Sequence, residues 1–295
     1  MIKIIVCLKV INQLCSERGF DGVKRTIDPD CIVKMVNPAD EYALEMAVHL
    51  KEREEAEVIA LSIAPEDDEK LLRSCFAMGA DWAYRIWEDG FDRLNGPAIA
   101  YLLSLAIRRL QGNLVLCGRR SADANGNEVG GYLAEFLTFP EVSGVTSIEA
   151  FEGRDKVICR RRIERKGWDL IETAIPAVLR VDRGEREPRY PNIFSILAWS
   201  EREIHVFNQA SLDPNSLYLE ECNSLTRVLE WIRPKPKKVF TPKSNLPPEE
   251  RIKLVLSGGL DKKKAEFIRG ETREIVSQMV DLLAKQKCFK PEGEG

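Results

Sequence analysis

Apolar segments of strand length alternate with helical patterns through about the first 140 residues. Each strand-like segment is rich in branched apolar residues, and each is followed by a stretch of helical periodicity. The predicted strands are 2–8, 57–63, 82–87 and 113–117, and the predicted helices are 37–53, 66–78, 96–110 and 128–137. This alternation favours right-handed βαβ crossovers, so we expect an α/β fold with a doubly wound, mostly parallel sheet.

Two of the predicted helices carry informative details. Asn37 is expected to cap the first helix, with Pro38 in the first helical position and Asp40 shortly after it. In the helix 96–110 the apolar residues recur at helical spacing and form one stripe. Such a stripe indicates packing against the core rather than ligand binding.

Beyond the last helix of this series the pattern changes to strand-like segments split by turns. The segments 145–153, 156–163, 168–175 and 177–182 predict an antiparallel excursion followed by a strand that returns to the main sheet. The basic run 159–166 lies on this excursion, where alternate side chains face opposite ways. We therefore expect a solvated hairpin there rather than a nucleic-acid patch.

The regular alternation ends after about residue 205. The segment 232–251 contains five prolines, which predicts an extended linker. A final helix is expected over 272–285, and its apolar side needs another surface to cover it. We therefore divide the chain into an α/β domain, residues 1–205, and a linker with a C-terminal arm, residues 206–295, whose terminal helix docks on a partner.

Composition disfavours several functional classes. The net charge is −3, so no strong field attracts nucleic acid or an anionic membrane. No apolar run approaches the roughly 20 residues of a membrane helix, and the first residues predict a strand rather than a signal peptide. The eight cysteines form no Cys-x-x-Cys pair, and His49 and His205 are the only histidines. We therefore expect a soluble cytoplasmic protein without a metal site or histidine-based acid-base catalysis.

The polar loop after the fourth predicted strand is the strongest candidate for a ligand site. In open α/β sheets, ligands bind beyond the carboxyl ends of strands. Gly118, Gly126 and Gly130 permit close backbone approach, and the amides near Glu128 open a helix whose positive end suits a phosphate. Neither a P-loop nor a dinucleotide fingerprint is present. From these residues alone, a nucleotide site and an ordinary βα loop stand as equal alternatives.

Several segments together resemble the beta subunit of electron transfer flavoprotein. In that family's order they are VCLKVIN, VNPADEYALEMAVHLKE, ALSIAPED, LLRSCFAMGADWA, VLCGRRSADANGNEVGGYLAEFL and IPAVLRVDRGEREPRYPNI. They cover roughly residues 1–200, and several motifs at the family's spacing are more specific than any one of them. The resemblance implies a Rossmann-type fold like that of adenine nucleotide alpha hydrolases, with residues 1–205 as the adenine-nucleotide-binding domain.

The resemblance also implies a function, cofactors and a site. Such a subunit has no catalytic residues; it pairs with an alpha subunit and carries electrons between a dehydrogenase, for example an acyl-CoA dehydrogenase, and an acceptor such as a quinone oxidoreductase. The alpha subunit supplies most of an FAD site, and the beta subunit holds AMP or, in electron-bifurcating NADH-linked members, a second FAD. The implied nucleotide-binding residues are Cys7, Asn37, Pro38, Ala39, Asp40, Ile63, Cys117, Gly118, Arg119, Arg120, Ser121, Ala122, Asp123, Ala124, Asn125, Gly126, Asn127, Glu128, Val129 and Gly130.

The loop departs from both family patterns. AMP-binding members carry Asp-Asp-Asp-Cys-Asn-Gln-Thr and bifurcating members carry Asp-Gly-Asp-Thr-Ala-Gln-Val-Gly, where this chain has DANGNEVG. Gly126 takes the place of the bifurcating threonine, so one hydroxyl ligand to phosphate is missing. Glu128 replaces a glutamine and puts negative charge near phosphate unless it points away. AMP and a second FAD therefore both stay open.

The segment 191–201 is where the family docks its dehydrogenase, through a leucine anchor followed by lysines. Here Ile193 takes the anchor position, Ile196 and Leu197 follow it, and the lysines are missing. The alternative is that these three residues form one helix face packed on the core. Within the arm 206–295, the segments 224–243 and 267–283 resemble the extended C-terminal arm of bifurcating-type beta subunits, which reaches to the alpha subunit.

Two rival functions come from other classes. The first is a stand-alone adenine-nucleotide-binding module, similar in fold to universal stress proteins. The second is an ATP pyrophosphatase, because the Ser-Gly-Gly-x-Asp motif at 257–261 resembles that family's pyrophosphate loop. The motif has Lys262 where that family has a serine and lies near the end of the chain, so we interpret it as a chance match.

Overall fold

The computed structural model describes residues 1–15, 20–21, 26–153, 155–163, 167–199, 201–226, 241–242, 245–256 and 270–285. The chain divides into two units, Met1–Arg233 and Pro234–Gly295, which are considered separately. The motif at 257–261 lies outside the described residues.

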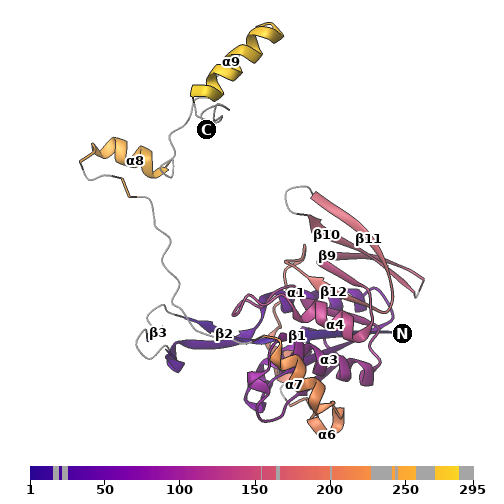
Figure 1. Cartoon of the computed structure of the whole chain (residues 1–295). Coiled ribbons are helices and arrows are strands. Elements are labelled where there is room, and N and C mark those ends of the chain that lie inside the picture. Colours follow the sequence, from indigo (N-terminus) through magenta and orange to yellow (C-terminus); the bar gives the residue numbers. More distant parts are fainter. Residues whose placement is uncertain are drawn as a thin grey trace. The chain divides into compact units, whose positions relative to one another are not determined.

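A nine-stranded sheet forms the centre of the first unit (Figure 1), in the order β11-β10-β9-β12-β8-β1-β6-β7-β13. The strands are β1 Ile2–Leu8, β6 Ala56–Ile63, β7 Trp82–Ile86, β8 Leu114–Gly118, β9 Glu141–Glu152, β10 Lys156–Ile163, β11 Gly167–Ala174, β12 Ala177–Val181 and β13 His205–Phe207. Along the series β9-β12-β8-β1-β6-β7-β13, every neighbouring pair of strands is parallel. At the other edge, β10 is antiparallel to both β9 and β11. The predicted parallel sheet, antiparallel excursion and return strand are confirmed.

Helices cover both faces of the sheet. They are α1 Pro38–Lys51, α2 Glu69–Met78, α3 Gly96–Leu110 and α4 Val129–Leu137, and a 3-10 turn, η3 Glu66–Asp68, precedes α2. Ile4 and Val6 of β1 belong to the core cluster that contains α1 and α2, whereas Ile5 and Cys7 belong to the cluster that contains α3 and α4. Because alternate residues face opposite layers, a strand covered on both sides is apolar throughout. The predicted doubly wound α/β fold is confirmed.

The chain leaves the central sheet after β1 to form a small arm that the sequence pattern did not predict. Strand β2 Val10–Leu14 pairs antiparallel with β5 Ile32–Val36, and β3 Phe20–Asp21 pairs with β4 Thr26–Ile27. Both β2 and β5 mix polar and apolar residues without a clear alternation, so periodicity gave no signal. A single residue, Lys9, separates β1 from β2.

Three further helices belong to the first unit: α5 Ile193–Trp199, α6 Gln209–Leu212 and α7 Ser216–Ser224. Asn95, which caps α3 by accepting from the Ala98 N–H, also donates through its side chain to the Cys222 carbonyl at 3.0 Å. This bond attaches the end of α7 to the start of α3, and Figure 1 shows α3, α6 and α7 together. The compact unit therefore runs past residue 205, and the division into 1–205 and 206–295 stays a prediction.

The second unit contains α8 Pro248–Leu256 and α9 Thr272–Lys285. The bounds of α9 are those predicted from the apolar periodicity. Val276, Met279 and Val280 on α9 are about half exposed, so this part of the helix has a substantial apolar surface that is accessible within its own unit.

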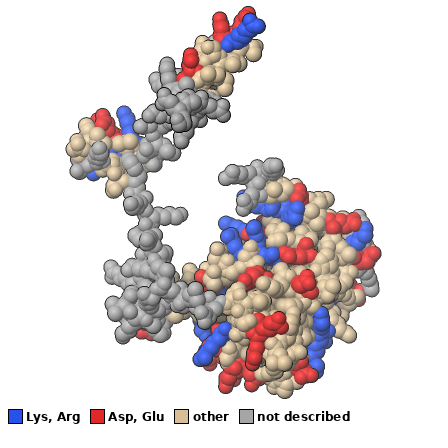
Figure 2. Space-filling model, in the orientation of Figure 1, with Lys and Arg blue, Asp and Glu red and all other residues tan. Residues whose placement is uncertain are grey.

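The next features are the apolarity of the helices and the distribution of charge on the surface. Within the described residues, no helix combines the length and apolarity needed to cross a membrane. Figure 2 shows acidic and basic side chains interspersed over the visible face of the first unit. This interspersion accords with the small net charge of −3.

Candidate functional site

The strand order reverses at the carboxyl ends of β1 and β8, where open α/β sheets form a crevice for a ligand. The strands β6 and β7 lie on one side of β1, and β8 and β12 lie on the other, so the strand order reverses at this point. Open α/β sheets bind ligands in the crevice outside such a reversal. Cys7 and Cys117 are paired in register here, and the loop 118–130 leaves β8 directly above them. The candidate loop therefore starts at the expected position for a ligand site.

Asp40 connects the two strand ends. Its Oδ1 accepts a hydrogen bond from the Gly118 N–H at 2.7 Å, and its Oδ2 accepts one from the Lys9 N–H at 2.8 Å. A Cβ on Gly118 would lie 2.3 Å from Oδ1, so the approach leaves no room for a side chain at this position. One carboxylate thus fixes the distance between the end of β1 and the end of β8.

Asn37 connects the start of α1 to the loop. Its side-chain amide donates to the Arg120 carbonyl at 3.0 Å, and its side-chain oxygen accepts from the Ala122 N–H at 3.0 Å. Asn37 occupies the N-cap position before Pro38 but makes no side-chain capping bond. The predicted N-cap position is confirmed, but the Asn37 side chain bonds the loop instead of its own helix.

The loop is also held by bonds of its own and by one ion pair. The Ser121 N–H donates to the Gly126 carbonyl at 3.0 Å, and the Gly126 N–H donates back to the Ser121 hydroxyl at 3.2 Å. Asp123 accepts from the Ala124 N–H, and its carboxylate lies 2.9 Å from the Lys9 ammonium. The turn between Ser121 and Gly126 is thus closed, and it is attached to the end of β1.

Arg180 of strand β12 holds the end of the loop, a role that was not predicted from the sequence. This buried side chain of β12 forms an ion pair with Glu141 at 2.7 Å and donates to the backbone carbonyl of Asn127 at 2.7 Å. It also donates to the side-chain oxygen of Asn127. The signal was available, because an arginine within the otherwise apolar strand AVLRV needs buried partners.

Glu128 points to a neighbouring helix. A Cβ on Gly96 would lie 2.2 Å from Oε1 of Glu128, which places the carboxylate against the first turn of α3. The positive end of a helix favours a negative group at this position. Glu128 also makes no side-chain capping bond to α4. Among the described residues, the Glu128 side chain therefore does not occupy the first N–H groups of α4, which suit an anion.

The remaining predicted residues lie on or beside this crevice. Pro38 and Ala39 form the first turn of α1, Val129 and Gly130 begin α4, and Ala124, Asn125 and Gly126 are exposed on the loop. Arg119 donates its N–H to the Val181 carbonyl at 2.7 Å, and its guanidinium pairs with Asp182 at 2.9 Å. Ile63 ends β6 at the same sheet edge, and among the described residues it joins neither the Asn37 nor the Asp40 hydrogen bonds. The structure therefore brings all of the set except Ile63 to one hydrogen-bonded loop and its supports.

Burial shifts the acidities around the crevice. Burial raises the pKa of Asp40 to about 7, against the opposing effect of the Lys9 and Gly118 N–H groups. Burial likewise raises the pKa of Cys117 to about 12 and places the pKa of Cys7 well above its ordinary value. Partial burial acts the same way on Asp123, but its bonds with Lys9 and Ala124 outweigh it and lower its pKa. Both thiols are therefore protonated at neutral pH and are poor nucleophiles.

The arrangement suits binding rather than bond chemistry. Its available groups are backbone N–H donors at the start of α4 and the exposed Arg120, which together suit a phosphate. In the described part of the chain, no group of three or more His, Cys, Asp or Glu side chains is placed to hold a metal ion.

The predicted docking residues lie on α5. Ile193, Ile196 and Leu197 are 60, 43 and 65% exposed, so the alternative in which they pack on the core is wrong. Trp199 at the end of α5 faces inward and stacks on Phe76, with ring centroids 6.1 Å apart. The short helix thus rests on the core through its last residue and presents its other apolar residues outward.

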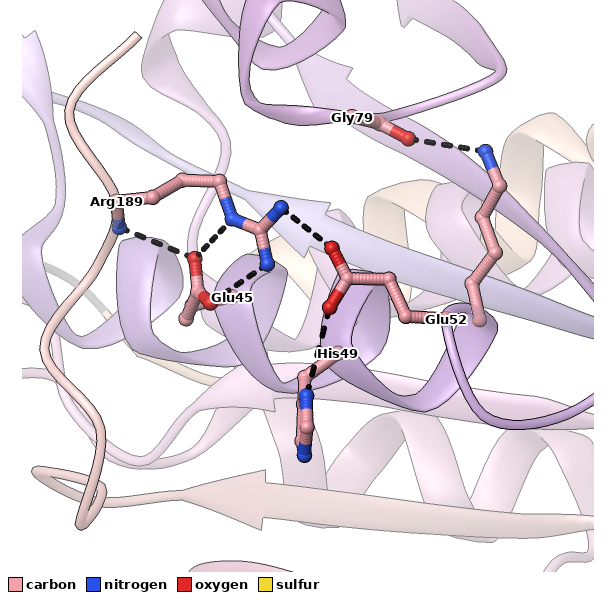
Figure 3. Close-up of polar contacts among 6 residues, drawn as sticks. Glu45, His49, Glu52, Gly79 and Arg189 are labelled. Atoms are coloured by element: carbon pink, nitrogen blue, oxygen red, sulfur yellow. Dashed lines mark hydrogen bonds and ion pairs between the residues drawn. The ribbon is translucent and has the colours of Figure 1, made fainter.

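An arginine fork fixes the segment that leads into α5 (Figure 3). The guanidinium of Arg189 donates to both carboxylate oxygens of Glu45, at 2.8 and 2.9 Å, and to Glu52 at 2.7 Å. The backbone N–H of Arg189 also donates to Glu45 at 3.0 Å. Glu45 lies on α1, the helix that also carries Asp40, and Glu52 is the C-cap residue of this helix. The segment before α5 is therefore attached to the middle and the C-terminal end of α1, whereas the loop 118–130 is attached to its N-terminal end.

Comparison with known proteins gives consistent matches. Residues 32–211 match the electron transfer flavoprotein domain family. The electron transfer flavoprotein subunit beta of Thermoanaerobacterium thermosaccharolyticum is 32% identical over 81% of this chain and 92% of its own length. The subunit beta of Megasphaera elsdenii is 29% identical over 97% of this chain and 100% of its own length. The caffeyl-CoA reductase-Etf complex subunit CarD of Acetobacterium woodii is 30% identical over 71% of this chain and 79% of its own length.

Proposed function

The chain belongs to the electron transfer flavoprotein family as a beta subunit, and on that premise we propose that its loop 118–130 holds an adenine nucleotide while it pairs with an alpha subunit. The pair carries electrons through an FAD that the two subunits share. The beta subunit supplies binding and positioning, and the flavin supplies the redox chemistry when it is bound.

The observation that carries this proposal is the attachment of the loop at three points. Asp40 fixes its start, Asn37 fixes its middle and Arg180 fixes its end. A loop held this firmly keeps the N–H groups at the start of α4 pointing in one direction without a ligand. Those N–H groups and the exposed Arg120 are what a nucleotide phosphate requires.

The nucleotide is AMP or a second FAD. Glu128 lies against α3, so its charge does not oppose a phosphate at the start of α4. Gly126 offers no hydroxyl, and its backbone N–H is engaged with Ser121. These two features favour phosphate binding by the N–H groups at the start of α4 rather than by Gly126, and both nucleotides stay compatible with such a site.

The surface of α5 is the proposed docking site for a dehydrogenase. Ile193, Ile196 and Leu197 give it an apolar centre, which can enter a pocket on the partner. The similarity to a subunit of a caffeyl-CoA reductase complex supports a partner that acts on CoA thioesters. A quinone oxidoreductase is the proposed acceptor, and the alternative is an electron-bifurcating complex that uses NADH.

The C-terminal arm is the proposed contact with the alpha subunit. The apolar residues Val276, Met279 and Val280 of α9 are accessible within their own unit. An amphipathic helix of this kind gains stability when a partner covers its apolar side.

The test is co-expression with an alpha subunit, followed by purification, acid release of cofactors and their quantitation. We expect FAD together with AMP, or twice as much FAD without AMP. A complex that contains no flavin contradicts the proposal. A stable, monomeric chain that binds ATP without any partner supports the stand-alone nucleotide-binding module instead.

A further inference from the structure

Lys9 is the residue at which the chain bends out of the central sheet, and the start of α1 holds its backbone. Its N–H donates to Asp40 at 2.8 Å, and its carbonyl accepts from the Asn37 N–H at 2.9 Å. Gly118, the last residue of β8, donates its N–H to the same carboxylate at 2.7 Å. Asp40 thus joins the two strand ends between which the strand order reverses.

Burial closes the Asp40 side chain off from a ligand. The residue is 4% exposed, and each carboxylate oxygen already accepts one of these backbone hydrogen bonds. We infer that Asp40 is a positioning residue, which holds the ends of β1 and β8 in the form that binds nucleotide without touching the nucleotide itself. This inference rests on the proposed nucleotide site.

The carboxylate form is the one that makes both bonds. An ionised carboxyl group accepts through both oxygens, whereas a protonated one has an O–H that must turn away from a neighbouring N–H. Adding a proton to Asp40 therefore weakens its hold on Lys9 or on Gly118. The loop then loses its fixed start, although Asn37 and Arg180 still hold its middle and its end.

The surroundings of Asp40 place this change near neutral pH. Burial raises the pKa of Asp40 to about 7. The titratable groups that interact with it are Lys9 and Cys7 of the β1 end, Cys117 of β8 and Cys75 of α2. The ammonium of Lys9 favours the carboxylate, and the thiols, whose pKa values are raised, are neutral at this pH. Among these groups, Asp40 is therefore the one whose protonation state changes near neutral pH.

The consequence is a nucleotide affinity that depends on pH. Above about pH 7 the carboxylate is ionised and the clamp is complete, so affinity is highest there. Below this pH the ionised fraction falls, and the apparent dissociation constant rises in inverse proportion to that fraction. If only the ionised form binds, the affinity at pH 6 is about tenfold lower than at pH 8.

The first experiment measures AMP and ADP binding to the full chain in complex with its alpha subunit, after bound nucleotide has been removed, between pH 6 and pH 8. We expect the wild type to bind several-fold more weakly at pH 6. Asp40→Asn should bind weakly at both pH values, because an amide offers one acceptor and turns a donor toward an N–H. Glu41→Gln is the matched control, since it removes a charge from the next residue of the same helix and should keep the wild-type profile.

The second experiment follows the backbone amide NMR signals of Lys9 and Gly118 in the wild-type full chain. Both should titrate together with a midpoint near pH 7, and this readout needs neither a ligand nor a folded variant. Amides that do not titrate between pH 6 and pH 8, or an AMP affinity equal at both pH values, overturn the inference. Titrating amides in a complex that binds no nucleotide at any pH contradict the proposed function while supporting the clamp.

Discussion

The side-chain oxygen of Asn37 accepts a hydrogen bond from the Ala122 N–H at 3.0 Å, across 85 positions of the chain. The same side chain donates to Arg120, so it bonds the loop in the way that a neighbouring backbone strand would. Because Asn37 also stands before the first turn of α1, it transmits the position of that helix to the loop. The Asn37 side chain thus positions the loop relative to α1.

Asn37→Ala should therefore disturb the loop more than the helix. It removes both bonds and leaves the Ala122 N–H without its partner, which costs about 1–3 kcal/mol of unfolding free energy. Asn37→Asp keeps the acceptor but loses the donor, so we expect it to fall between the wild type and the alanine variant. Urea denaturation of the three proteins measures this order, and equal stability of Asn37→Ala and the wild type would show that the bonds contribute nothing.

Gly118→Ala should destabilise the crevice, whereas Gly126→Ala in the same loop should be tolerated. A Cβ on Gly118 meets Asp40 at 2.3 Å and Ala39 at 2.8 Å, but a Cβ on Gly126 meets its nearest neighbour, Ser121, at 3.5 Å. Overpacking of this kind costs about 1–3 kcal/mol. Thermal unfolding of both variants checks the prediction, and a loss of stability that is the same for both would contradict it.

Arg189→Lys should loosen the segment before α5 although it keeps the positive charge. A lysine cannot reproduce the fork that donates to both oxygens of Glu45 and to Glu52. We expect a loss of about 1–3 kcal/mol, because Glu45 is buried and loses charged partners. Arg183→Ala is the control, since its contacts with Glu187 and Tyr42 lie at the surface and it should change stability little. Limited proteolysis near α5 gives a second readout, and resistance equal to the wild type would count against an anchoring role.

The contribution of Asp40 to stability should decrease as the pH rises. Its pKa is raised from 3.8 to about 7 by burial, so the folded chain keeps this proton over a range in which the unfolded chain has lost it. The stability that it contributes is therefore fully present below pH 3.8 and is lost as the pH rises through about 7. The slope is at most about 1.4 kcal/mol per pH unit.

Denaturation of the wild type and of Asp40→Asn at several pH values between 4 and 8 isolates this contribution. The free energy of unfolding of the wild type, relative to the variant, should fall across this range. A difference that stays constant with pH would mean that the carboxyl group titrates at its ordinary value in the folded chain.

The sequence predicts the central layers of this fold well, because they follow from periodicity. The bounds of α3 and α9 coincide with their apolar stripes, and the hairpin β10–β11 with its return strand β12 follows from the turns between strand-like segments. The β2–β5 arm was missed because its strands lack alternation. Helices α6 and α7 were missed because much of what holds them to α3 is contact between distant parts of the chain, such as the bond from Asn95 to Cys222.

The sequence predicts the location of the candidate site more accurately than the contacts between its residues. The rule for strand ends located the loop at the end of β8. The partners of its residues depend on tertiary geometry: Asn37 turns to the loop instead of its own helix, and Glu128 turns to α3. Lys9 was not identified because its role appears only when β1 and α1 are brought together. Arg180 was missed although an arginine within the apolar strand β12 indicates buried partners.

The most direct test of the central claim is the nucleotide content of the complex with its alpha subunit, compared between the wild type and Asn37→Ala. We predict that acid treatment of the wild type releases AMP or a second FAD in addition to the FAD shared with the alpha subunit. The variant should keep the shared FAD and lose the additional nucleotide, because only the loop 118–130 loses its support. A wild-type complex without the additional nucleotide, or a variant that retains it fully, would contradict the claim that this loop holds it.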